Sequence, residues 1–135
     1  MLKALKVRLR DILNVDLLAG AEVIAGEAGM DCVITSVNVM EVPDIVDWVR
    51  PGELLLTTAY SLSNDIEAFN TLLPIFSQKG VCGLGIKTKR YINELPDSVI
   101  QTANRLAFPI IRIPPDVSYG DLMKQVFTFI IGEQT

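Results

Sequence analysis

The residues best suited to chemistry are four carboxylates that lie close together in the first half of the chain. They are Glu41, Asp44, Asp47 and Glu53, and the first three recur every three residues. Paired carboxylates can exchange protons with a substrate, and oxygen ligands are what Mg²⁺ prefers. The same spacing also places side chains on one face of a short helix, where carboxylates are ordinarily solvated. We favour the solvated face and expect no catalytic residues among these four.

The sequence excludes the common forms of nucleophilic catalysis because it contains no histidine. Mechanisms of the Ser-His and Cys-His types both need that base. Cys32 and Cys82 are far apart in sequence and form no C-x-x-C motif, so we expect no zinc site. The pair would be enough for one disulfide, but two buried free thiols in a reducing cytosol are the favoured interpretation. We therefore expect no enzyme, no metal and no cofactor.

A second group of polar residues follows two apolar runs of the sequence. Thr57 and Thr58 end the first run, with Tyr60 just beyond, and Lys87 follows the second run. In an open parallel sheet, ligands bind outside the carboxyl ends of the strands. We therefore predict an effector site at Thr57, Thr58, Tyr60 and Lys87, suited to a small polar or anionic molecule. The alternative is an ordinary solvated loop at the end of the sheet.

Two glycines in the second run bear on this site. Gly83 and Gly85 are two residues apart and therefore lie on the same face of the predicted strand. Glycines at such positions indicate that something approaches the backbone closely. Either a packed helix fills the space, or the missing side chains leave room for a ligand beside Lys87.

The elements that must position these residues alternate between strands and helices. We predict strands at 22–25, 33–40, 53–58, 81–86 and 110–113, and helices at 7–18, 43–49, 66–78, 96–107 and 119–131. Pro74 should kink or shorten the third helix. This order predicts one α/β domain over residues 1–135, with a mainly parallel sheet flanked by helices.

Composition limits the partners of the chain. Its 135 residues are 50% hydrophobic and 21% charged, which is typical of a well-covered globular domain. A net charge of −4 argues against direct DNA binding by this chain alone, because phosphate backbones attract cationic surfaces. No run approaches the roughly 20 apolar residues of a membrane span. We expect a cytoplasmic protein that does not bind membranes.

The last predicted helix, 119–131, is apolar on nearly all sides. Such a helix needs cover on more than one side. We predict that it packs partly against the sheet and partly against a second copy of the chain, giving a homodimer. The predicted interface residues are Met123, Phe127, Phe129 and Ile130. Trp48 is expected to anchor the core or an interface rather than to stack on a ligand.

The central segment carries a resemblance to a known family. It reads EVPDIVDWVRPGELLLTT, with GEAGMD before it and GVCGLGIKTKRYI after it. This pattern resembles the N-terminal domain of the purine catabolism regulator (PucR) family of bacterial transcription regulators. The match extends from VRLRDIL to FPIIRIP. Two positions depart from the family pattern, which has arginine where this chain has Cys32 and glycine where it has Ala59.

The resemblance implies a regulatory domain that senses a ligand or relays a signal in purine or nitrogen metabolism. It also implies a fold distantly similar to the N-terminal domain of bacterial HPr kinase. The helix-turn-helix of the family is not expected within these 135 residues. Three functions therefore stand: a sensor of a small metabolite, a ligand-free dimerisation module, and, least favoured, a fragment of an enzyme.

Overall fold

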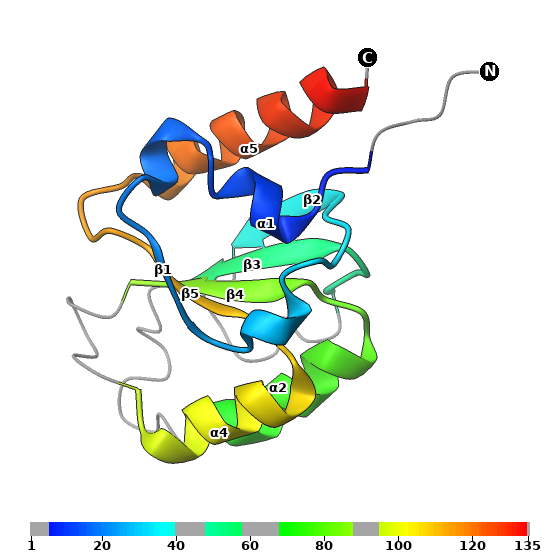
Figure 1. The fold of residues 1–135 in the computed structure, drawn as a ribbon, viewed down its shortest axis with the longest axis vertical. Helices are drawn as coiled ribbons and strands as arrows, with labels where there is room; N and C mark the ends of the chain where they lie inside the picture. The colour runs from blue at the N-terminus through cyan, green and yellow to red at the C-terminus, as the bar shows by residue number, and fades with distance from the viewer. Residues whose placement is uncertain (1–5, 40–47, 58–67, 88–94, 135) are drawn as a thin grey trace.

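The computed structural model describes residues 6–39, 48–57, 68–87 and 95–134. In this part of the chain, a five-stranded sheet with the order β1-β5-β4-β3-β2 forms the centre of the protein (Figure 1). The strands are β1 (Glu22–Ala25), β2 (Ser36–Val39), β3 (Glu53–Thr57), β4 (Gly83–Ile86) and β5 (Ile110–Arg112). The α-helices are α1 (Leu9–Ile12), α2 (Phe69–Gln78), α4 (Asp97–Leu106) and α5 (Tyr119–Gln134), and the 3₁₀ helices are η1 (Asp16–Leu18) and η2 (Glu27–Gly29).

The pairing of the strands confirms the predicted α/β class. Strands β2, β3, β4 and β5 run parallel to their neighbours, and β1 joins the edge antiparallel to β5. Helix α2 connects β3 to β4, and α4 connects β4 to β5. A parallel pair needs such a crossover, because the chain must return to the same end of the sheet.

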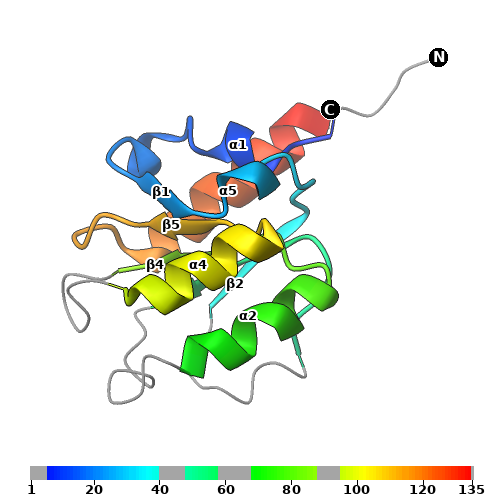
Figure 2. The same cartoon turned by 60° about the horizontal axis from the view of Figure 1, so that its bottom comes forward.

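Helices cover both faces of the sheet and give three layers. Helices α1 and α5 lie on one face, and α2 and α4 lie side by side on the other (Figures 1 and 2). The three consecutive leucines of β3 show how one strand serves both layers. Leu55 packs toward α2 and α4, whereas Leu54 and Leu56 pack toward α1 and α5. Both faces are apolar, as expected of a parallel strand that is covered on both sides.

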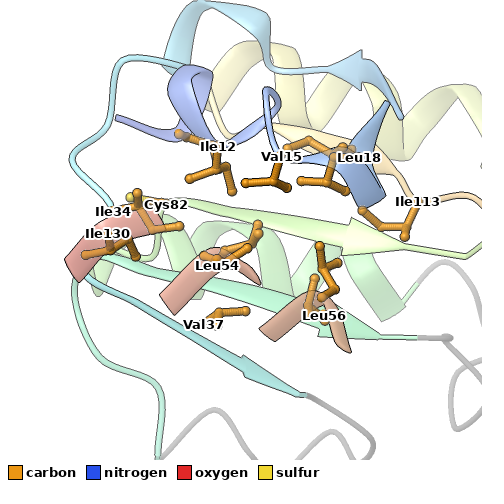
Figure 3. Close-up of a cluster of buried hydrophobic side chains, with 14 of the residues drawn as sticks. Ile12, Val15, Leu18, Ile34, Val37, Leu54, Leu56, Cys82, Ile113 and Ile130 are labelled. Atoms are coloured by element: carbon orange, nitrogen blue, oxygen red, sulfur yellow. The ribbon is translucent and has the colours of Figure 1, made fainter. Parts of the chain in front are cut away.

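The two hydrophobic cores come from widely separated parts of the sequence. The core under α2 and α4 includes Phe69, Leu73, Phe76, Leu84, Val99, Phe108 and Ile110. The core under α1 and α5 includes Ile12, Val15, Leu18, Ile34, Val37, Leu54, Leu56, Cys82, Ile113 and Ile130 (Figure 3). The first half of the chain contributes Ala25, Val49 and Leu55 to the core under α2 and α4, so each core contains residues from both halves.

The helix boundaries follow simple backbone rules. Pro96 precedes the first turn of α4, and Ser118 caps α5 by accepting a hydrogen bond from the backbone N–H of Asp121 at 3.4 Å. Pro74 lies inside α2 and does not shorten it, since the helix continues to Gln78 and ends before Gly80, whose φ is +83°. The predicted kink stays a prediction. None of the helices in the described residues is long and apolar enough to cross a membrane.

The space beside the two glycines of β4 is filled by the protein itself. A Cβ atom on Gly85 would lie 2.8 Å from Cδ2 of Leu56 and 3.2 Å from Ile113. A Cβ atom on Gly83 would lie 3.0 Å from the carbonyl oxygen of Pro109 and 3.1 Å from Leu9. The glycines therefore permit close packing within the chain, including packing of α1. Of the two alternatives, close packing within the chain is the one observed, and the alternative of room for a ligand at these two glycines is wrong.

The expectation of two free thiols is also wrong. Cys32 and Cys82 form a disulfide, with their Cα atoms 5.6 Å apart. Cys32 lies shortly before β2 and Cys82 immediately before β4, so the fold brings together two residues that are 50 positions apart. The prediction relied on cellular compartment alone, which cannot take account of this proximity.

Candidate functional site

Three described residues lie at the carboxyl ends of the parallel strands. Thr57 ends β3, Lys87 follows β4, and Tyr119 begins α5. We call these three residues the strand-end cluster. Thr58 and Tyr60, the other predicted effector residues, lie outside the described residues.

The strand-end cluster is held by hydrogen bonds to one carbonyl group. The phenol oxygen of Tyr119 donates to the backbone carbonyl of Thr57 at 2.6 Å. The backbone N–H of Lys87 donates to the same carbonyl at 3.2 Å. The ammonium nitrogen of Lys87 lies 4.4 Å from the centroid of the Tyr119 ring, within the range of a cation–π contact. The positive charge is thereby placed over a rigid aromatic surface.

The start of α5 explains why Tyr119 reaches this edge. Ser118 accepts a backbone hydrogen bond from Leu122 at 2.9 Å and so forms the first turn of the helix. Tyr119, the next residue, is partly buried in the core between α5 and the sheet. The cap therefore fixes the position of the Tyr119 ring, and the phenol group of this ring reaches the end of β3.

Arg112 is a further charged residue at this edge, and sequence reasoning missed it. In the sheet register, Thr57 pairs with Ile86 and Ile86 pairs with Arg112. The three side chains therefore share the face covered by α2 and α4. The available signal was a single arginine in the apolar run from Ile110 to Ile113.

Not every N–H group of the Arg112 guanidinium has a hydrogen-bond acceptor within the described residues. Its Nη1 donates to Oε1 of Glu22 at 3.0 Å. Its Nε is buried and has no hydrogen-bond partner within the described part of the protein. A buried N–H without an acceptor is costly, and an acceptor from outside the protein would relieve that cost.

The chemistry of this edge suits the binding of an anion. Lys87 supplies a cation on the α5 face, and Arg112 supplies one on the opposite face of the same sheet edge. Thr57 is only 1% exposed, so the end of β3 is a firm support for both. Charge-assisted hydrogen bonds from such groups favour carboxylates and phosphates.

Of the four carboxylates considered for catalysis, Glu53 is the one that lies within the described residues. Glu53 is buried, and its Oε1 accepts a hydrogen bond from the backbone N–H of Arg50 at 3.0 Å. It therefore stabilises the turn before β3. Glu41, Asp44 and Asp47 lie outside the described residues. Within the described ranges, no group of three His, Cys, Asp or Glu residues could hold a metal ion.

Helix α5 contributes to the core with one side and leaves apolar side chains on its flanks. Ile130 is buried in the core of the chain itself, whereas Met123, Phe127 and Phe129 are only partly buried. Ile131 is 61% exposed. Met123, Phe127 and Ile131 recur every four residues and so form one stripe along the helix, which we call the α5 stripe.

Trp48 lies away from the core. Its side chain is 73% exposed, so the expectation that it anchors the core is wrong. The other expected role, as an interface anchor, stays a prediction. Its large exposed ring is of the type that is enriched at protein interfaces.

Comparison with known proteins relates the sequence of this chain to purine catabolism regulatory proteins. A sequence model of the "Purine catabolism regulatory protein-like family" matches residues 11–130. The chain is also 37% identical over 125 residues to the "Purine catabolism regulatory protein" of Bacillus subtilis (strain 168). That alignment covers 93% of this chain and 24% of the relative. The chain thus spans about a quarter of the length of the curated relative it matches.

Proposed function

Because the chain belongs to the purine catabolism regulatory protein-like family, we propose that it is the regulatory domain of a bacterial transcription regulator. In this proposal the domain binds a small anionic metabolite of purine or nitrogen metabolism at the strand-end cluster and the neighbouring Arg112. Binding changes the state of the regulator, and the domain itself performs no catalysis. With a net charge of −4, it does not bind duplex DNA on its own.

The observation that carries the proposal is the unsatisfied Nε of Arg112. A buried guanidinium N–H that lacks an acceptor within the described residues is the type of group that a bound carboxylate or phosphate satisfies. Lys87 lies beyond Ile86, the residue that pairs with Arg112 in the sheet. A ligand that extends around the end of the sheet, from Arg112 on the α2–α4 face to Lys87 on the α5 face, would gain one charge-assisted contact from each.

The neighbouring contacts support a sensing role as well as binding. Lys87 lies over the ring of Tyr119, and Tyr119 begins α5. An effector that engages Lys87 would therefore act on the first turn of the longest described helix. This gives a direct physical connection between ligand binding and the position of α5.

A thermal-shift screen of the 135-residue chain tests the effector proposal. The panel contains purine catabolites, amino acids and other nitrogen metabolites, with uncharged analogues as controls. A ligand at a hundredfold excess over its Kd stabilises the folded state by about 2.7 kcal/mol, which raises the Tm by several degrees. We expect anionic members of the panel to raise the Tm and their uncharged analogues to leave it unchanged. The absence of any shift across the panel would contradict the proposal.

A second candidate function is dimerisation without a ligand. The observation that favours it is the α5 stripe, since Ile131 is 61% exposed and Met123 and Phe127 are only partly covered. A row of apolar side chains on one flank of a long helix suits an antiparallel or parallel contact with a second copy. The two functions are compatible, because the strand-end cluster and the α5 stripe involve different residues.

A further inference from the structure

A cavity of about 320 Å³ opens at the end of the sheet opposite to the strand-end cluster. It lies at the amino ends of the strands, because Cys82 precedes β4 and Phe108 precedes β5. Its lining also includes Asp31, Cys32, Ser77 and Ala107. The cavity therefore has both halves of the disulfide in its wall.

The disulfide is the reactive group of this cavity. Asp31, at its rim, accepts a hydrogen bond at 2.9 Å from Nε of Arg10. This bond and the charge of Arg10 hold the pKa of Asp31 below its usual value, so the carboxylate stays ionised and paired. Ser77 is a weak nucleophile, and no histidine exists in the sequence to activate it.

The two cysteines differ in their accessibility. Cys82 is 1% exposed and belongs to the core under α1 and α5. Cys32 is only partly buried. A nucleophile entering the cavity would therefore reach Cys32 first, and Cys82 would be the buried leaving group.

We propose that the cavity and the Cys32–Cys82 disulfide form a thiol-exchange site for low-molecular-weight thiols. The volume lies at the lower end of the range for small-molecule sites, which suits a small thiol better than the active site of a protein reductase. This chemistry is independent of effector binding at the other end of the sheet.

The reaction consists of two balanced exchange steps. A thiolate attacks Sγ of Cys32, a new S–S bond forms, and the Cys32–Cys82 bond breaks. The electron pair leaves on Sγ of Cys82, which takes up a proton. A second small thiolate then attacks the sulfur of the first, releasing Cys32 as a thiol and a small-molecule disulfide. The protein disulfide gains two electrons, and the two small thiols are oxidised.

Reduction would release one specific contact within the fold. The disulfide joins the segment before β2 to the start of β4. That segment also holds α1, because the backbone N–H of Leu9 donates to the carbonyl of Cys32 at 2.8 Å. Ile34 and Ile130 lie beside Cys82 in the same core (Figure 3). The bond therefore sits where α1, the sheet and the C-terminal part of α5 meet.

Reduced and oxidised glutathione are the probes for this site, followed by acid quenching and mass spectrometry of the peptides. In Cys82→Ser, oxidised glutathione should add to Cys32. In Cys32→Ser, we expect addition to the buried Cys82 to be at least about tenfold slower. Circular dichroism checks that both variants are folded.

A second pair of variants tests the cavity. Ala28 is exposed and lines the cavity, whereas Ala19 is exposed and does not. Ala28→Phe should slow reduction of the disulfide by reduced glutathione about fivefold or more, and Ala19→Phe should leave the rate unchanged. If Ala28→Phe fails to fold, the proposal is tested by comparing the rates of glutathione addition to the two cysteine variants, and equal rates would contradict it.

Three outcomes would overturn the proposal. The first is free thiols in protein purified without a reductant. The second is that reduced glutathione reduces the disulfide at equal rates in Ala28→Phe and Ala19→Phe, or that it reduces the disulfide no faster than the whole protein unfolds. The third is reduction by a protein dithiol such as thioredoxin but not by glutathione.

Discussion

The phenol oxygen of Tyr119 donates a 2.6 Å hydrogen bond to the backbone carbonyl of Thr57, across a sequence separation of 62 residues. This contact joins the first residue of α5 to the last residue of the buried central strand. The same carbonyl also accepts the backbone N–H of Lys87. The start of α5 and the backbone after β4 are thus both bonded to one oxygen atom at the end of β3.

Tyr119→Phe should lower the free energy of unfolding by about 0.5–1.5 kcal/mol, the usual net worth of one hydrogen bond. The carbonyl of Thr57 keeps the bond from Lys87, which limits the loss. Chemical denaturation measures the change. Tyr119→Leu, which also removes the ring below Lys87, should cost more, and an equal cost would show that the cation–π contact contributes nothing.

The fold was largely predictable because its signals are local. Apolar runs such as Leu54–Leu56, the proline before α4 and the capping serine before α5 all act within a few residues. The site was predictable in part, since parallel strands bring Thr57 and Lys87 to one edge. The role of Arg112, the filled space at Gly85 and the disulfide depend on distant parts of the chain, and no local pattern contains that information.

Gly85→Ala should destabilise the protein by about 1–3 kcal/mol, the usual cost of overpacking a core. The added methyl group would lie 2.8 Å from Cδ2 of Leu56. Gly132→Ala, where an added Cβ meets no atom within 4 Å, is the control and should stabilise α5 by roughly 0.5–1 kcal/mol. Thermal unfolding of both variants gives the comparison. If Gly85→Ala leaves the stability unchanged, the space beside β4 is open, and a ligand could bind there after all.

Reduction of the disulfide should lower the free energy of unfolding by about 2–4 kcal/mol, because the bond closes a long loop in the unfolded chain. The two half-cystines are 50 residues apart. Urea denaturation with and without a phosphine reductant measures the difference. The double variant Cys32→Ser, Cys82→Ser serves as the control and should not respond to the reductant. If the reductant changes the free energy of unfolding of both proteins equally, the disulfide does not contribute to stability.

Ile131→Glu should weaken self-association about tenfold or more if the α5 stripe is a dimer interface, since it buries a charge in an apolar contact. Ile131 is 61% exposed, so the monomer should remain folded. Thr128→Glu adds the same charge at an exposed position away from the stripe and is the matched control. Sedimentation equilibrium measures the association. A wild-type chain that stays monomeric at high concentration would exclude this interface.

The proposed function requires a small anionic effector to bind at the strand-end cluster. Isothermal titration of the strongest ligand from the thermal-shift panel tests it most directly, in wild type, Lys87→Ala and Lys79→Ala. Lys79 lies at the C-terminal end of α2, before β4 begins, and is exposed. Loss of a charge-assisted bond worth roughly 1.5–3 kcal/mol should raise the Kd of Lys87→Ala about tenfold or more, with Lys79→Ala near wild type. Equal Kd values for the two variants would place the effector elsewhere and contradict the account.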